Sequence, residues 1–157
     1  MSRLYGRALR STRCYSAVPF GHWHTATLIA ALRQERISAP LLVDGPMNGD
    51  IFLAYIEQVL CAELQSGDIV ICDNLSSHKV TGVREAIERC GAQLLYLPAY
   101  SPDLNPIEMA FAKLKASLRQ AAQRTFAGIQ AATAQALDSF SSTHCQNFFR
   151  HAHYTSN

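Results

Sequence analysis

The chain has 157 residues, of which 48% are hydrophobic and 17% charged, and its formal net charge is only +2. This length suits a single globular domain over residues 1–157, and no repeat, low-complexity block or linker divides it. No apolar run approaches the roughly 18 residues of a membrane span, and no secretory signal opens the chain. We therefore expect a cytoplasmic protein that makes no membrane contact.

The five cysteines are widely spaced and odd in number, without a C-x-x-C pair. This usage indicates a reduced chain in which cysteines serve as small core residues rather than as disulfides or zinc ligands. The His22-x-His24 and His151-x-His153 pairs lack a third convergent ligand in the sequence, which argues against a zinc site.

Positive charge gathers at the N-terminus. Residues 1–34 contain five arginines and no acidic residue; the arginines are Arg3, Arg7, Arg10, Arg13 and Arg33. A basic segment of this kind suits contact with phosphate groups. A solvated or disordered arm is the alternative interpretation.

Strands are predicted in the first third of the chain. Residues 14–20, 25–32 and 39–43 are short apolar or β-branched runs separated by turn residues. Asp44-Gly45-Pro46 interrupts the third run. We expect these three strands to form an antiparallel meander.

Helix and strand alternate in the middle of the chain. Four segments are predicted: a helix from Asn48 or Asp50 to about residue 64, a strand over 68–73, a helix over 79–90 and a strand over 94–97. The run Ile69-Val70-Ile71-Cys72 is typical of a strand buried on both faces, so this strand is expected to be the most buried one. Strand, helix and strand at this spacing predict a parallel pair with a right-handed crossover.

A proline-rich loop and further helices follow. Pro98 ends the last predicted strand, and Asn105-Pro106 makes a good N-cap and first helical position. Apolar residues recur at helical spacing from Ile107 to Leu118, which predicts a core-facing helix. Helices are also expected over 126–140, capped by Thr125, and over 142–152, capped by Ser141 or Ser142. These elements predict an α/β fold with a mixed sheet flanked by helices.

Two carboxylates are predicted to meet at one edge of this sheet. Asp73 follows the buried strand, and ligands gather at the carboxyl ends of parallel strands. Glu108 lies in the first turn of the helix after the next strand, and 34 residues separate it from Asp73. The alternatives are that Asp73 only opens a turn and that Glu108 completes a capping box with Asn105.

Two carboxylates at one place, without a Lys or Arg directly beside either, repel each other. A hard divalent cation relieves this repulsion, and Mg²⁺ prefers one or two carboxylates together with water and phosphate oxygens. Such a site suits phosphodiester chemistry, in which metal ions activate the nucleophile and stabilise the leaving oxygen.

Residues 73–79 (DNLSSHK) and 97–108 (LPAYSPDLNPIE) resemble the second and third acidic motifs of DDE transposases. The resemblance is to the mariner-like superfamily, in its bacterial insertion-sequence branch, which also uses this interval between the two acids. Residues 43–48 (VDGPMN) and 3–7 (RLYGR) are similar to further segments of that branch. The resemblance covers nearly the whole chain.

The resemblance implies a ribonuclease-H-like fold and a two-metal site for Mg²⁺ or Mn²⁺, with Asp73 and Glu108 as its second and third acidic ligands. Members of the family cut DNA at transposon ends with water and then use the freed 3′-hydroxyl to attack target DNA. Transposon-end and target DNA are therefore the implied partners, with a homodimer as a further one. The implied location is the bacterial cytoplasm, at the nucleoid when DNA is bound.

One feature of the family is absent from this sequence. The first catalytic Asp of the family lies on the first strand, upstream of the segment that resembles residues 3–7. We therefore expect an N-terminally truncated domain without that strand, inactive by itself. It is either a truncated copy or the second half of an enzyme completed by an upstream reading-frame product. Asp44 follows a later strand and is a poor substitute for the first Asp.

Three functions remain open from the sequence. The first is a transposase catalytic domain that requires upstream sequence. The second is a non-catalytic DNA-binding or dimerising fragment that modulates full-length transposase, and the third is a degenerate relic.

Several other residues are candidates for accessory roles. His78 is a candidate for contact with a phosphate or a metal-bound water, and Asn105 for orienting the site. An ordinary loop histidine and a helix cap are the alternatives. Tyr100 and Trp23 are candidates for stacking on bases, with core or loop packing as the default. The predicted DNA-contacting residues are Arg3, Arg7, Arg10, Arg13, Lys79, Lys115 and Arg119.

Overall fold

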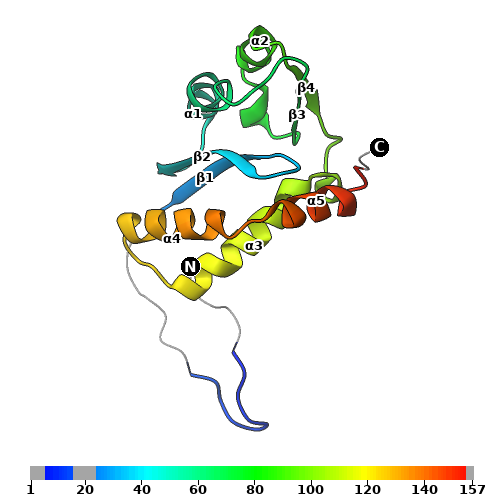
Figure 1. Ribbon diagram of the computed structural model, residues 1–157. Coiled ribbons are helices and arrows are strands. Elements are labelled where there is room, and N and C mark those ends of the chain that lie inside the picture. Colours follow the sequence, from blue (N-terminus) through cyan, green and yellow to red (C-terminus); the bar gives the residue numbers. More distant parts are fainter. Residues whose placement is uncertain (1–5, 16–23, 155–157) are drawn as a thin grey trace.

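The computed structural model describes residues 6–15 and 24–154. The elements in chain order are β1 (Ala26–Leu32), β2 (Ile37–Asp44), α1 (Gly49–Tyr55), the π-helical η1 (Ile56–Leu60), β3 (Ile69–Cys72), the 3₁₀ turn η2 (Ser76–Lys79), α2 (Val83–Arg89), β4 (Gln93–Tyr96), η3 (Pro102–Leu104), α3 (Pro106–Ala121), α4 (Phe126–Asp138) and α5 (Ser142–His151). In Figure 1, α1, α2, β3 and β4 lie above the β1–β2 hairpin, and α3, α4 and α5 lie below it.

The first two described strands form an antiparallel hairpin, as the sequence predicts. Their register runs from Ala26 opposite Asp44 to Leu32 opposite Ile37, with an irregularity between Ile29 and Ala31. Ala39 has a positive φ of 50° and precedes Pro40. A bulge at this place lets β2 accommodate a proline, which has no N–H for a regular ladder.

The strand predicted over residues 14–20 is not observed where the structure describes that segment. Cys14 and Tyr15 belong to no strand, and residues 16–20 lie outside the described residues. The predicted three-stranded meander is therefore represented by two strands in the described ranges.

The second pair of strands is parallel, and this prediction is confirmed. Ile69 lies opposite Gln93 and Cys72 opposite Tyr96. However, β3 is not the most buried strand, because Ile69 is 56% exposed while Leu94 of β4 is 2% exposed. Across the described residues the strands form two two-stranded sheets, β1–β2 and β3–β4. The mixed α/β class is correct, but the single sheet expected from the sequence is split.

Both helices in the middle of the chain are shorter than predicted. Asn48 caps α1, and its side chain accepts a hydrogen bond from the Ile51 amide at 2.8 Å. The last helical turns widen into η1, which ends at Leu60. Gly82 adopts a positive φ of 98° immediately before α2, so the helix starts at Val83 rather than at residue 79.

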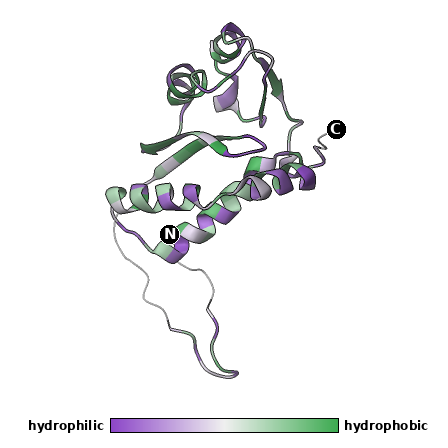
Figure 2. Ribbon diagram, viewed as in Figure 1, coloured by the Kyte–Doolittle hydropathy of each residue, from purple (hydrophilic) through white to green (hydrophobic). Residues whose placement is uncertain are grey.

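The main core lies between α1, η1, α2 and the β3–β4 sheet. Its buried members are Ala39, Phe52, Tyr55, Ile56, Leu60, Val83, Ala86, Ile87, Ala92 and Leu94. Figure 2 shows the strands as mostly hydrophobic and the helices as mixed, which is the pattern expected of helices that cover a sheet. This packing holds the carboxyl ends of β3 and β4 beside the loop that leads to α3.

The C-terminal helices pack against one another, with α3 contacting both α4 and α5. Thr125 accepts a hydrogen bond from the Gly128 amide and caps α4, and Ser141 accepts one from the His144 amide and caps α5. Both caps confirm the sequence prediction. None of the helices in the described ranges is long and apolar enough to cross a membrane.

An ion pair ties the hairpin to the second sheet. Arg33, just after β1, donates hydrogen bonds to the Asp68 carboxylate, one of them at 3.3 Å. It also donates to the backbone carbonyl of Glu63 at 2.9 Å. Arg33 therefore joins the end of β1 to the start of β3.

Candidate functional site

Asp73 and Glu108 line the same cavity, of about 380 Å³. Asp73 is the residue directly after β3, and Glu108 lies in the first turn of α3. The cavity walls are Asp73, Asn74, Leu75, Leu97, Pro98, Ala99, Tyr100, Ser101, Pro102, Asn105 and Glu108. The fold thus brings together two acids that are distant in the sequence, as expected for a strand end and a helix start at one sheet edge.

The Asp73 carboxylate has two neighbours. Its Oδ1 accepts a hydrogen bond from the Leu75 amide at 3.1 Å, which is the turn expected as the alternative interpretation. The same oxygen lies 2.6 Å from His78 Nδ1. No hydrogen bond joins these two side chains, and His78 Nδ1 has no hydrogen-bond partner among the described residues. Asp73 therefore opens a turn and also faces His78.

His78 is held in place from two sides. Its ring lies against the Phe52 ring, with centroids 4.2 Å apart. Its backbone carbonyl accepts a hydrogen bond from the Tyr96 hydroxyl at 2.8 Å. His78 therefore belongs to the short turn η2 rather than to an open loop, and its ring is positioned beside Asp73.

Glu108 does not form the capping box. The Asn105 amide donates to the Pro102 carbonyl at 2.9 Å, and the carboxylate of Glu108 makes no hydrogen bond or ion pair within residues 6–15 and 24–154. The exposed Glu108 side chain is thus available to a ligand. This arrangement excludes the capping box with Asn105, which the sequence left open as an alternative role for Glu108.

Asn105 does not act as a side-chain cap either, although it precedes α3. No side-chain hydrogen bond caps this helix. Pro106, at the first helical position, has no backbone N–H and therefore needs no acceptor. The prediction of a capping Asn105 is wrong. Its side chain instead lines the cavity with Asp73 and Glu108.

Cys72 is the residue between β3 and the cavity. Burial, with a smaller effect from the negative charge of Asp73, raises the pKa of its thiol to about 12. A protonated thiol is a poor metal ligand, so Cys72 acts as a core residue at neutral pH. Cys145 is buried and Cys61 and Cys90 are partly buried, as expected of core residues, whereas Cys14 is exposed and does not have that role.

The oxygen donors of the cavity fit a hard divalent cation only in part. Mg²⁺ and Mn²⁺ accept carboxylate and amide oxygens, which Asp73, Glu108 and Asn105 supply. No group of three His, Cys, Asp or Glu side chains is placed to hold a metal in the part of the chain that the structure describes. Asp44, at the end of β2, does not line the cavity and so does not supply a third acid.

Tyr100 is a wall residue whose side chain is completely exposed, at 102% of its reference area. Its φ of 59° lies in the left-handed region, where a bulky side chain is an outlier. The expectation that Tyr100 packs in a core or loop is wrong.

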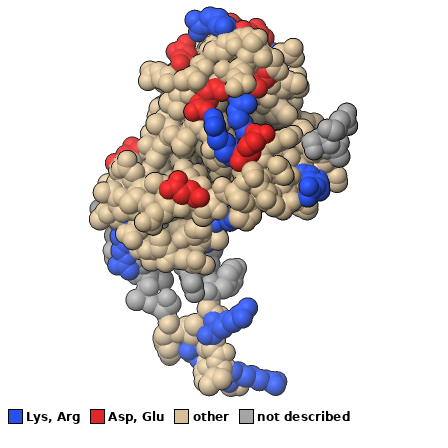
Figure 3. Space-filling view, viewed as in Figure 1, with Lys and Arg blue, Asp and Glu red and all other residues tan. Residues whose placement is uncertain are grey.

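The predicted DNA-contacting residues do not converge on this cavity. Arg7, Arg10 and Arg13 are exposed in residues 6–15, and Arg3 lies outside the described residues. Figure 3 shows Lys and Arg scattered among acidic residues on one face rather than gathered in a stripe.

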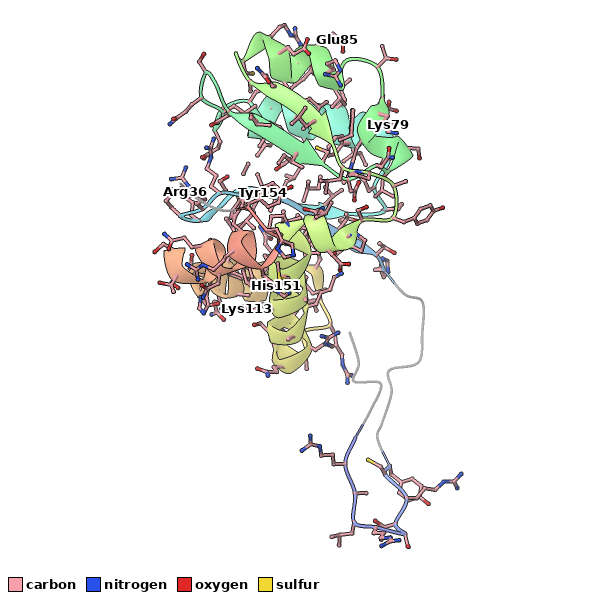
Figure 4. The ribbon with its side chains drawn as sticks, turned by 90° about the vertical axis from the view of Figure 1, so that its right-hand side faces the viewer. Arg36, Lys79, Glu85, Lys113, His151 and Tyr154 are labelled. Atoms are coloured by element: carbon pink, nitrogen blue, oxygen red, sulfur yellow. The ribbon has the colours of Figure 1, made fainter. Side chains whose placement is uncertain are left out.

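Lys79, on η2, has its ammonium 5.6 Å from the centre of the Tyr96 ring. Figure 4 places Lys79 with the upper elements, and Lys113 of α3 among the C-terminal helices. Lys115 and Arg119 are exposed on α3. Their contact with DNA stays a prediction.

Solved structures of Mos1 transposase share this fold. The chain matches the Mos1 strand transfer complex with a TM-score of 0.73 at 18% identity, covering 98% of this chain and 46% of that one. It matches the Mos1 mariner paired-end complex with Mn with a TM-score of 0.70 at 18% identity, covering 98% and 47%. The chain therefore spans about half the length of these transposase chains.

The catalytic domain of Mos1 mariner transposase matches with a TM-score of 0.63 at 19% identity, covering 83% of this chain and 74% of that one. These likenesses confirm the predicted ribonuclease-H-like fold. No curated protein sequence matches the chain.

The family is shown by a separate comparison. The family model described as DDE superfamily endonuclease matches residues 1–130, a stretch that includes Asp73, the proline-rich loop and Glu108. This agrees with the resemblance carried by residues 73–79 and 97–108. The chain belongs to the DDE superfamily of endonucleases.

Proposed function

We propose that the chain is the catalytic part of an insertion-sequence transposase that cleaves DNA strands and transfers them with the help of Mg²⁺. The observation that carries the proposal is the cavity that Asp73 and Glu108 share, together with a Glu108 carboxylate that is not used to cap α3. A carboxylate left free at a helix start, opposite another carboxylate, is a typical place for a hard cation.

Each side chain has a separate role in the proposal. Asp73 and Glu108 hold the cation, and Asn105 adds a neutral oxygen or an N–H donor at the same wall. His78 lies against Asp73 and limits the positions that the Asp73 carboxylate can take. When bound, the cation supplies charge that stabilises the nucleophile and the leaving oxygen of a phosphodiester.

DNA is the proposed partner. One Mos1 structure is a paired-end complex with a left transposon end, and the fold of this chain is similar to that protein. Transposon-end DNA then approaches the cavity past Tyr100, with the scissile phosphate at the acids. A bacterial origin, Mg²⁺ rather than Mn²⁺ as the working ion, a cytoplasmic location and a homodimer are parts of the same proposal.

The proposed activity needs a third acidic ligand besides Asp73 and Glu108. The upstream reading-frame product is the proposed source, since the resemblance puts the first acid of the family on an upstream strand. The second candidate function is that of a non-catalytic DNA-binding or dimerising fragment. It is favoured because two acids, Asp73 and Glu108, line the cavity and no third possible ligand joins them in the described residues.

The test uses the complete transposase that contains this sequence and measures Mg²⁺-dependent cleavage of transposon-end DNA. Asp73→Asn and Glu108→Gln are each expected to lower the cleavage rate at least about a hundredfold, because each removes one charge that holds the cation. The matched control is Asp103→Asn, since Asp103 is an exposed acid in η3 that does not line the cavity. Full cleavage by the Asp73→Asn protein would remove Asp73 from the mechanism.

A further inference from the structure

Two cysteine thiols share one hydrogen-bond acceptor. Cys61 Sγ donates to the backbone carbonyl of Ala86 at 3.5 Å, and Cys90 Sγ donates to the same oxygen at 3.3 Å. The two cysteines lie on different elements, because Cys61 directly follows η1 and Cys90 directly follows α2. The fold therefore brings two thiols that are distant in the sequence to one atom.

The other three cysteines lie in separate places. Cys14 is exposed, Cys72 ends β3, and Cys145 is buried in α5. Across the described residues, none of these three shares a hydrogen-bond acceptor with another cysteine. Two cysteines whose side chains point apart cannot form a disulfide. The shared acceptor shows that Cys61 and Cys90 point to the same place.

The elements that carry the two thiols are held together by further contacts. η1 packs against α2, and Leu60, Ala86 and Ile87 belong to the buried core between them. On the surface, Arg89 of α2 donates a hydrogen bond to the Glu57 carboxylate of η1 at 3.2 Å. These contacts keep the two helix ends, and with them the two thiols, side by side.

The surroundings of the two thiols decide which one reacts first. Burial, followed by the neighbouring Cys90 thiol, raises the pKa of Cys61 to about 12. Because the thiolate rather than the thiol is the nucleophile, Cys61 stays unreactive at neutral pH. Both residues are only partly buried, so a small oxidant can reach them from the solvent. Cys90 is therefore the thiol that an oxidant meets first.

We propose that Cys61 and Cys90 form a modification site for hydroperoxides, which convert the two thiols to a reversible disulfide that joins η1 to α2. With hydrogen peroxide, the Cys90 sulfur attacks one oxygen, the O–O bond breaks, and a sulfenic acid forms while one water leaves. The Cys61 sulfur then attacks the Cys90 sulfur, the S–O bond breaks, and a second water leaves with the Cys61 proton. Two thiols are oxidised, and one peroxide is reduced to two waters.

The disulfide would close a loop that carries part of the candidate site. Residues 61–90 contain β3, Asp73 and η2. A cross-link restricts the unfolded chain more than the folded one, so it stabilises the fold around the closed loop. The oxidised form would therefore hold the segment that carries Asp73 more firmly. Formation of the disulfide does not depend on the proposed function.

The probe is hydrogen peroxide, added to the full chain under native conditions. Peptide mapping by mass spectrometry without reductant then locates the oxidised residues. We expect the loss of two of the five free thiols, one linked pair of peptides that contains Cys61 and Cys90, and recovery of both thiols with dithiothreitol. A linkage that involves Cys14, or oxidation of Cys90 to sulfinic acid without any linkage, would overturn the proposal.

Serine variants separate the two steps. Cys61→Ser should accumulate the sulfenic acid at Cys90, where dimedone labels it. Cys90→Ser should be labelled at Cys61 at least about tenfold more slowly, because that thiol stays protonated. Equal labelling of the two variants would contradict the assigned order. The matched control is Cys14→Ser, which should form the disulfide at the rate of the unaltered chain, and a tenfold slower rate would show that the linkage requires Cys14.

The stability of the oxidised chain tests whether the disulfide fits the native fold. In the Cys14→Ser protein, oxidation should raise the midpoint of urea denaturation by at least about 1 M, because the disulfide closes a long loop. A midpoint that stays the same or falls would show that the linkage forms outside this fold, and would overturn the proposal. When the chain is unfolded in urea before oxidation, the preference for Cys61 and Cys90 should disappear. The same preference in the unfolded chain would show that the fold does not create the site.

Discussion

His78 Nδ1 lies 2.6 Å from Asp73 Oδ1, and the His78 ring is held against Phe52. The contact places the His78 ring against the carboxylate that the candidate site needs, and the ring limits the positions that the Asp73 side chain can take. His78 is thus a positioning residue for Asp73 in the proposed site.

Removal of the His78 ring should weaken metal binding without unfolding the chain. We expect His78→Ala to lower the Mn²⁺ affinity of the site about 10- to 100-fold, the usual effect of losing the partner of a metal ligand. Titration followed by electron paramagnetic resonance of free Mn²⁺ measures this. His144→Ala is the control, because His144 lies on α5, where its ring accepts a hydrogen bond from the Ser141 amide and does not line the cavity. Equal loss in both variants would point to a general effect on the fold.

The Glu108 side chain should contribute little to the stability of α3. Glu108→Ala is expected to change the free energy of unfolding by less than about 0.5 kcal/mol, because no capping bond is lost. Glu85 provides the comparison, since its carboxylate accepts a hydrogen bond from the Gly82 amide at 3.0 Å at the start of α2. Glu85→Ala should lower the free energy of unfolding, measured by urea denaturation, by about 1 kcal/mol, because alanine has no acceptor for this amide. A larger loss for Glu108→Ala than for Glu85→Ala would restore the capping-box interpretation.

The exposed ring of Tyr100 should contribute to DNA binding. The left-handed backbone of this residue should at the same time lower the free energy of unfolding of the chain. Tyr100→Gly relieves the left-handed backbone, so we expect the free energy of unfolding to rise by about 0.5–1 kcal/mol. The same change should weaken binding to a transposon end with an unpaired terminus by about 1–3 kcal/mol, the usual value of stacking on a base. Tyr100→Phe should keep the affinity. Unchanged affinity in the glycine variant would show that the ring contacts no base.

The ion pair between Arg33 and Asp68 should make the free energy of unfolding depend on pH in the acid range. The hydrogen bond from Arg33, followed by the one from the Gln65 amide, lowers the pKa of the Asp68 carboxyl. The stabilisation is therefore present above the unfolded-state pKa of about 3.9 and is lost as the pH falls through the lower folded-state value. Thermal unfolding between pH 2 and 7 measures this loss.

The Asp68→Asn variant should lack that part of the pH dependence. At pH 7 we expect it to be less stable by about 1–2 kcal/mol, since the pair is only about one quarter exposed. Glu57→Gln, which breaks the exposed pair with Arg89, should cost less than about 0.5 kcal/mol. Equal losses in the two variants would argue that Arg33 and Asp68 are an ordinary surface pair.

The sequence predicted most of what is local in this fold. Asn48, Thr125 and Ser141 cap helices as expected because each side chain acts within its own turn. The parallel pair of β3 and β4 followed from its single short crossover. Asp73 and Glu108 reach one cavity because strand ends and helix starts share that edge of the sheet.

What the sequence missed depends on contacts between distant segments. The apolar run Ile69-Val70-Ile71-Cys72 predicts complete burial, but β3 has no neighbour on one edge among the described strands. The Asn105 pattern predicts a cap, yet the Asn105 amide is used by the preceding turn and its side chain faces the cavity. The His78 contact with Phe52 joins residues from η2 and α1, which no local pattern encodes.

Titration of the chain with Mn²⁺ tests the shared-cation site most directly. The unaltered chain and the Asp103→Asn control should bind the ion at the same affinity, while Asp73→Asn and Glu108→Gln should each weaken binding at least about tenfold. Binding that is equal in all four proteins, or absent from all of them, would contradict a cation held between Asp73 and Glu108.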